Sequence, residues 1–142
     1  MIYPRDACDT RPRVLLVDDD DAVRDALYML LESDGYQVLA ASNGPDGLSI
    51  FRRSIPPIEL LVTDYNMPRM SGLELARECS RLSRDLRVLY ISGSGPDEEL
   101  QEDLEAPNRE FAAKPFRGPE LLRKARELLC GEARGQLTAS RR

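Results

Sequence analysis

Four groups of polar residues stand directly after short apolar runs, and together they could handle a metal ion and a phosphate. They are the four aspartates at 18–21, Asp64, the segment Ser92-Gly93-Ser94, and Lys114. Crowded carboxylates repel one another and raise each other's pKa, which a divalent cation relieves. Hard oxygen ligands suit Mg²⁺, which takes one or two carboxylates and leaves room for phosphate oxygens. The residue types therefore predict a magnesium site, with Asp19 and Asp64 as its direct ligands.

The same residues include the groups that phosphoryl transfer to a carboxylate requires. Protein groups assist that transfer by positioning the reactants and by neutralising the charge on the phosphoryl oxygens. Asp64 would accept the phosphoryl group, Lys114 would supply a positive charge, and Ser92 would donate a hydrogen bond. Gly93, next to Ser92, would leave space for the incoming group. This interpretation requires that the four groups meet in the fold.

Each group also has an ordinary structural interpretation. Asp20 and Asp21 fit the residue preferences at the start of a helix, and Asp64 could simply begin a turn. A serine and glycine segment is often a flexible loop, and Lys114, which precedes a proline, could be a solvated charge. All four ordinary interpretations would have to hold together at one edge of one sheet, so the chemical interpretation is favoured.

The hydrophobic pattern predicts five strand and helix pairs. The expected strands are 13–17, 36–41, 58–63, 86–91 and 110–113. The expected helices are one from Asp21 that stops at Gly35, then 45–53, 72–82, 97–104 and 119–129. Such alternation predicts a parallel sheet with helices on both faces, and a ligand site beyond the carboxyl ends of the strands. The four polar groups stand at those strand ends.

The size and charge of the chain limit what it can be. With 142 residues it fits one domain, expected at 13–130, with tails at 1–12 and 131–142. A net charge of −5 argues against the basic face of a nucleic-acid-binding protein. Three separated cysteines and no histidine exclude a disulfide framework or a zinc site. No apolar run approaches a membrane span or a signal peptide, so a cytoplasmic location is expected.

Four motifs give the chain a resemblance to the response-regulator receiver family of two-component signalling, over residues 13–130. They are residues 14–20 (VLLVDDD), 61–68 (LVTDYNMP) followed by 70–72 (MSG), 88–93 (VLYISG) and 111–116 (FAAKPF). Their order and spacing make the match specific. The resemblance implies an α/β fold of the flavodoxin-like (βα)₅ type, a doubly wound parallel sheet of five strands in the order 2-1-3-4-5.

The resemblance also assigns roles to individual residues. It implies that Asp64 is the phosphoacceptor and that Asp19, Asp64 and the backbone carbonyl of Asn66 bind Mg²⁺, with Asp18 acting through water. Mn²⁺ is an alternative ion. It makes Lys114 a catalytic residue and implies that the bond between Lys114 and Pro115 is cis.

Two further roles concern the response to phosphorylation. Ser92 matches the hydroxyl that switches towards the phosphoryl group, and Phe111 matches the aromatic side chain that moves with it. Phe111 has no hydroxyl group, which excludes a signal read through a tyrosine hydrogen bond at that position. Asn66 and Ser94 occupy the two positions that tune the lifetime of the phosphoryl group in this family.

The expected function is that of a phosphorelay module rather than an enzyme. A sensor histidine kinase or a histidine phosphotransfer protein would supply the phosphoryl group, and the chain would catalyse only its own phosphorylation and dephosphorylation. The change at Asp64 would then switch a surface that binds a downstream protein, without contact to nucleic acid or membrane. The sequence leaves open a stand-alone regulator or a part of a hybrid kinase. Because the helix at 97–104 offers only Leu100 and Leu104, it also leaves open a monomer or a weak dimer.

Two other functions remain as alternatives. A phosphohydrolase of the haloacid dehalogenase type also places a nucleophilic aspartate after its first strand, which residues 18–21 could imitate. It would need a later acidic cluster, and it would leave Asp64 without a role. A degenerate receiver that acts only as a scaffold is disfavoured by the complete set of Asp19, Asp64, Ser92 and Lys114.

Overall fold

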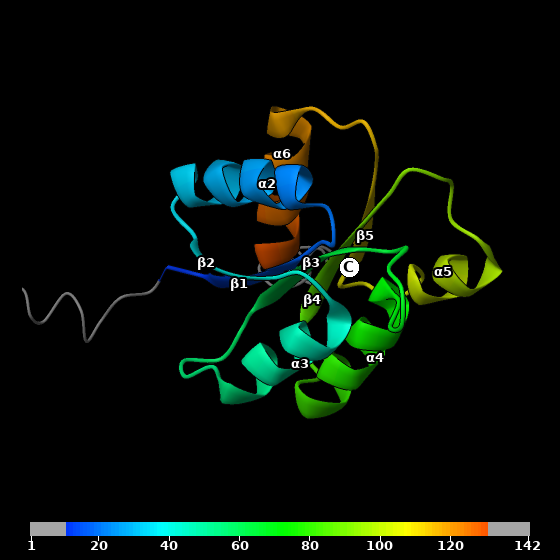
Figure 1. Ribbon diagram of the computed structural model, residues 1–142, viewed down its shortest axis with the longest axis horizontal. Helices are drawn as coiled ribbons and strands as arrows, with labels where there is room; N and C mark the ends of the chain where they lie inside the picture. Colours follow the sequence, from blue (N-terminus) through cyan, green and yellow to red (C-terminus); the bar gives the residue numbers. More distant parts are fainter. Residues whose placement is uncertain (1–10, 131–142) are drawn as a thin grey trace, which may run out of the picture.

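Five parallel strands form one sheet in the centre of the computed structural model, which describes residues 11–130 (Figure 1). The strands are β1 (Arg13–Val17), β2 (Gln37–Ala41), β3 (Leu60–Asp64), β4 (Arg87–Ser92) and β5 (Arg109–Ala113). Their order is β2-β1-β3-β4-β5, which confirms the order expected from the sequence. The expected tails lie outside the described residues, except for Arg11 and Pro12.

Five helices cover the two faces of the sheet. They are α2 (Asp21–Ser33), α3 (Gly44–Arg53), α4 (Gly72–Leu82), α5 (Glu98–Asp103) and α6 (Gly118–Leu129). Figure 1 shows α2 and α6 on one face and α3 and α4 on the other, with α5 beside α4. Among the described residues, no helix is both long enough and apolar enough to cross a membrane.

The central strands are apolar along their whole length because both of their faces are covered. In β1, Leu15 and Val17 belong to the core under α3 and α4, whereas Val14 and Leu16 belong to the core under α2 and α6. All four of these side chains are completely buried. This explains why the strands read as continuous apolar runs rather than as alternating patterns.

Side chains that precede the helices fix where four of them start. Asn43 caps α3, because its side-chain oxygen accepts a hydrogen bond from the backbone N–H of Asp46. The carboxylate of Asp20 accepts hydrogen bonds from the backbone of Ala22 and Val23, so Asp20 caps α2. Ser71 and Glu74 form a reciprocal capping box at the start of α4. Asp97 caps α5 through the backbone N–H of Leu100. The capping interpretation is thus correct for Asp20, although it does not extend to Asp18.

Two strands, β3 and β4, end one residue later than the sequence predicts. Asp64 pairs with Ile91 as the last residue of β3, and Ser92 pairs with Ala113 as the last residue of β4. The ladder continues because the N–H of Lys114 donates to the carbonyl of Ser92, with 2.8 Å between N and O. Backbone pairing therefore holds the two functional candidates rigidly in the sheet, rather than in the loops that follow.

Candidate functional site

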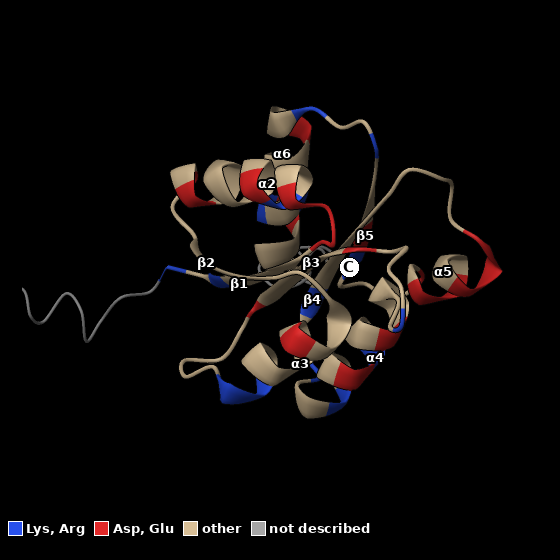
Figure 2. Cartoon of the chain, viewed as in Figure 1, with Lys and Arg blue, Asp and Glu red and all other residues tan. Residues whose placement is uncertain are grey.

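Three aspartates meet where β1 and β3 end side by side. Asp18, Asp19 and Asp64 each offer a carboxylate oxygen, and these oxygens lie within 4.8 Å of one another. Asp18 is completely buried and Asp64 is 6% exposed, whereas Asp19 is exposed. Figure 2 shows this acidic strip leading into α2. The sheet order therefore brings the first two groups of polar residues together.

Lys114, just beyond β5, supplies the positive charge at this edge. Its Nζ lies 3.5 Å from Oδ1 of Asp64 and 3.7 Å from Oδ2 of Asp18. The peptide bond between Lys114 and Pro115 is cis, as the resemblance implied. Lys114 thus contacts two of the three clustered carboxylates, and the cluster keeps an excess of negative charge.

Burial and like charges make the ionised carboxylates costly at this site. Burial raises the pKa of Asp64 to about 6, and the charge of Asp18 adds to this effect, while Lys114 opposes it. Burial also raises the pKa of Asp18, against a hydrogen bond from the backbone of Asp20 and the charge of Lys114. A pKa of about 6 leaves Asp64 mainly ionised at neutral pH, which a nucleophilic carboxylate requires.

One buried oxygen supports the fit of a divalent cation. Oδ1 of Asp18 accepts a hydrogen bond from the N–H of Asp20 at 2.9 Å, but Oδ2 is buried without a hydrogen-bond partner. Buried polar atoms normally have partners, and a cation would satisfy this one. The nearby donors are hard oxygens, which are the ligands that Mg²⁺ prefers. The described residues therefore fit a magnesium ion.

The hydroxyl group of Ser92 is buried beside this cluster and is held by its neighbours. It accepts a hydrogen bond from the side-chain amide of Asn66 at 3.2 Å and another from the backbone N–H of Ser94 at 3.2 Å. The hydroxyl of Ser94 is 3.4 Å away. The two expected tuning residues thus both contact the expected switch residue.

Phe111 lies on the neighbouring strand, directly opposite Tyr90 in the β4–β5 register. Its ring is partly buried and packs against the core under α3 and α4, to which Tyr90 also belongs. The structure therefore places the expected aromatic switch residue on the sheet face that carries α5.

Some residues of the site were not expected from the sequence. Thr63 is a buried polar residue in an otherwise apolar strand, and Arg24 donates to the backbone carbonyl of Asp18 at 2.8 Å. Gly72 is required for space, because a Cβ there would collide with the carbonyl oxygen of Asp64. A threonine within an apolar run is the sequence feature that indicates Thr63. The contacts of Arg24 and Gly72 depend on the tertiary fold.

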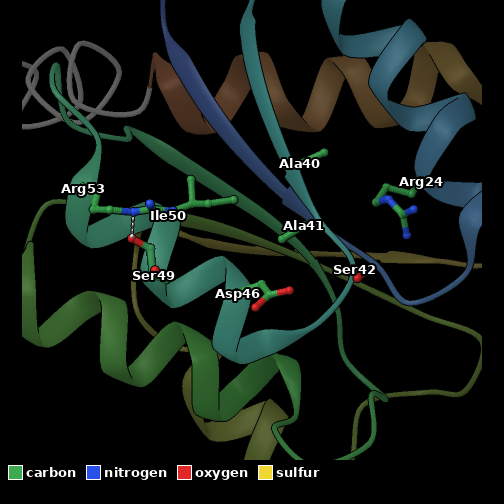
Figure 3. Close-up of a pocket in the computed structure, with 8 residues that line it drawn as sticks. All are labelled: Arg24, Ala40, Ala41, Ser42, Asp46, Ser49, Ile50 and Arg53. Atoms are coloured by element: carbon green, nitrogen blue, oxygen red, sulfur yellow. Dashed lines mark hydrogen bonds between the residues drawn. The ribbon is translucent and has the colours of Figure 1, made fainter.

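A cavity of about 390 Å³ lies next to the site without including its aspartates (Figure 3). It runs between the end of β2 and α3, with Arg24 across from Ser42 and Asp46. Asp18, Asp19 and Asp64 do not line it. This cavity thus belongs to the neighbouring edge between β2 and α3 rather than to the aspartate cluster.

Comparison with known proteins identifies the family. A family model described as the response regulator receiver domain matches residues 14–126. The response regulator MprA of Mycobacterium leprae is 38% identical over 117 residues, which cover 82% of this chain and 50% of that protein. The chain thus spans about half the length of this relative.

Solved structures agree with that match. A CheY-like response regulator receiver domain protein from Methanospirillum hungatei has a TM-score of 0.78 and 27% identity, over 88% of this chain and 99% of that chain. The response regulator TrrA from Thermotoga maritima, in complex with Mg²⁺-BeF, has a TM-score of 0.70 and 30% identity, over 82% of this chain and 98% of that chain.

Proposed function

The chain belongs to the response regulator receiver domain family, and on that premise we propose that Asp64 accepts a phosphoryl group in a two-component phosphorelay. The observation that carries the proposal is the contact between Asp64 and Lys114, at 3.5 Å, beside the Asp18 oxygen that is buried without a hydrogen-bond partner. The donor is a phosphohistidine on a sensor histidine kinase or a histidine phosphotransfer protein.

Mg²⁺ is the proposed cofactor, with Mn²⁺ as a substitute of similar ligand preference. Asp19, Asp64 and the backbone carbonyl of Asn66 would hold it directly, and Asp18 through water. When bound, the ion would offset the repulsion among the carboxylates and neutralise charge on the phosphoryl oxygens. The related protein TrrA was crystallised with Mg²⁺-BeF, which supports this assignment.

Side chains of the protein have separate roles in the transfer and in the response to it. An oxygen of the Asp64 carboxylate forms a bond to phosphorus while the bond between phosphorus and the histidine nitrogen breaks, and the imidazole leaves with its electron pair. Lys114 neutralises the charge of the transferred group. Ser92 leaves Asn66 and donates its hydroxyl hydrogen bond to the phosphoryl group, and Phe111 repacks as Ser92 moves.

The product is a signal rather than a released compound. The chain catalyses only its own phosphorylation and dephosphorylation, so we do not propose an enzyme that acts on other substrates. Asn66 and Ser94, which contact Ser92, set how long the phosphoryl group lasts. The altered surface then binds a downstream protein, and the chain acts as a monomer or a weak dimer.

Intact-mass measurement tests the central assignment. The protein is incubated with Mg²⁺ and acetyl phosphate, as wild type, as Asp64→Asn, and as the control Asp25→Asn, which removes an exposed carboxylate of α2. Wild type and control should gain the mass of one phosphoryl group, whereas Asp64→Asn should gain none. Equal labelling of Asp64→Asn would refute the assignment. Steady turnover of a generic phosphate ester would instead support the phosphohydrolase alternative.

A further inference from the structure

Tyr65, which directly follows Asp64, links the N-terminal end of the short helix α5 to the sheet. The hydroxyl of Tyr65 lies 2.8 Å from both carboxylate oxygens of Asp97, the residue that caps α5. Oδ1 of Asp97 also accepts the hydrogen bond from the N–H of Leu100, at 2.9 Å. Tyr65 therefore contacts the group that starts the helix.

A second tyrosine attaches the other end of α5. The hydroxyl of Tyr90 donates to Oδ2 of Asp103, the last residue of the helix, at 2.6 Å. The guanidinium of Arg109 donates to the same oxygen at 2.9 Å and also reaches Ser80 at 2.9 Å. Tyr90 is completely buried, and the side chain of Arg109 is 10% exposed. This end of α5 is thus fixed by a buried, charge-assisted network.

The two attachments differ in how easily they can be broken. Asp97 is exposed and Tyr65 is only partly buried, so water can replace their hydrogen bond. In the network at Asp103, by contrast, water cannot reach Tyr90, because that side chain is completely buried. A helix of six residues has little stability of its own, so its position depends on these outside contacts.

The bond between Tyr65 and Asp97 joins the two segments that phosphorylation should disturb. Tyr65 directly follows Asp64, and its N–H is tied to the carbonyl of Ile91 at 2.8 Å. Asp97 stands five residues after Ser92, at the end of the loop that Ser92 must pull when it leaves Asn66. Movement at either strand end therefore acts on one partner of this hydrogen bond.

In the strand pair β4 and β5, Tyr90 carries the hydroxyl group that contacts α5. Tyr90 and Phe111 are neighbours across these strands, but Phe111 lacks a hydroxyl group. The rings of Tyr65 and Tyr90 pack edge to face, with centroids 6.3 Å apart and an angle of 87°. The hydroxyl groups that reach α5 from the sheet are thus on β4 and just beyond β3.

We propose that Tyr65 is the positioning residue through which the state of Asp64 controls the position of α5. On phosphorylation, the hydrogen bond between Tyr65 and Asp97 breaks, and the start of α5 moves while its end stays fixed at Tyr90 and Arg109. This inference rests on the proposed phosphoacceptor function of Asp64, and it adds the route by which that site reaches a binding surface. Several exposed acidic residues lie on α5, so its movement changes a charged face of the protein (Figure 2).

Hydrogen exchange of the α5 amides tests this route. Wild type, Tyr65→Phe and the control Tyr28→Phe, which removes a hydroxyl from α2, are compared with and without Mg²⁺ and beryllium fluoride, a tetrahedral mimic of a phosphoryl group. In wild type and control, the mimic should speed exchange at Leu100 and Gln101 by about two- to tenfold, as expected for loss of one exposed hydrogen bond. In Tyr65→Phe these amides should already exchange faster without the mimic.

The informative quantity is the change that the mimic causes, since a purely structural role would alter only the starting rate. Fluorine NMR shows independently that each variant binds beryllium fluoride. If Tyr65→Phe binds the mimic and keeps the full wild-type change, the inference is wrong, and the proposed function stands. If wild type gains no phosphoryl group from acetyl phosphate, the proposed function fails and the inference fails with it.

Discussion

The side-chain amide of Asn66 donates a hydrogen bond to the hydroxyl of Ser92, with 3.2 Å between Nδ2 and Oγ. The two residues stand two positions after Asp64 and at the end of β4, so the bond crosses from one strand end to the next. Ser92 must give up this contact before it can reach a phosphoryl group on Asp64. The bond therefore stabilises the unphosphorylated arrangement.

Replacement of Asn66 by alanine should favour the phosphorylated arrangement. One net hydrogen bond contributes about 0.5–1.5 kcal/mol, so the affinity for beryllium fluoride in the presence of Mg²⁺ should rise by about two- to tenfold. Titration followed by NMR measures this affinity. Ser33→Ala is the control, because it removes an exposed side-chain hydrogen bond of α2 that lies outside the site. Weaker binding in Asn66→Ala would show that Asn66 mainly supports the site.

Asp64 should lower the stability of the protein at neutral pH. Burial raises its pKa to about 6, so the protonated carboxyl contributes stability below its ordinary pKa, and that contribution is lost as the pH rises through about 6. Asp64→Asn should therefore raise the free energy of unfolding at pH 7 by about 1–3 kcal/mol, with a smaller gain near pH 4. Urea unfolding in EDTA measures this, with Asp25→Asn as the control. A gain independent of pH would contradict the proposed origin.

Lys114→Met should slow phosphorylation by acetyl phosphate. Its ammonium group lies 3.5 Å from Asp64, and loss of a charge-assisted contact of about 1.5–3 kcal/mol corresponds to about 10- to 100-fold in rate. The matched control is Lys124→Met. Lys124 is the only other lysine of the chain; it lies on α6, and its Nζ is 3.6 Å from Oε1 of Glu110. Time-resolved intact mass gives both rates. Equal rates in the two variants would remove Lys114 from the mechanism.

Gly72→Ala should disturb both the fold and the site. A Cβ at position 72 would collide with the carbonyl of Asp64, so we expect a loss of about 1–3 kcal/mol in the free energy of unfolding. Phosphorylation should slow as well, because the backbone of Asp64 must shift. Gly95→Ala is the control, since no other group lies within 4 Å of a Cβ there. Similar losses in both variants would argue against the close approach at Gly72.

The sequence predicts the fold well because a strand buried on both faces has few acceptable compositions. Val14, Leu15, Leu16 and Val17 form a run that is typical of a covered parallel strand, and the alternation of such strands with helices predicts the parallel sheet. The meeting of Asp18, Asp19, Asp64 and Lys114 follows in turn from parallel strands that end at one edge.

The contacts within the site are harder to predict, because they depend on register and on side-chain direction. The hydrogen bond from Asn66 to Ser92 requires that the loop after β3 brings Asn66 to the end of β4. The bonds of Tyr65 to Asp97 and of Tyr90 to Asp103 link residues 32 and 13 positions apart. Neither spacing matches a helix or a strand, so no periodic pattern in the sequence indicates these partners.

The site is divided among the ends of β1, β3, β4 and β5, so it exists only when the whole sheet has formed. A chain that has paired β1 with β3 but has not yet added β5 carries the aspartates without Lys114. Under the proposed function, such a chain would hold the phosphoacceptor without its neutralising cation, so competence for phosphoryl transfer would require the complete sheet.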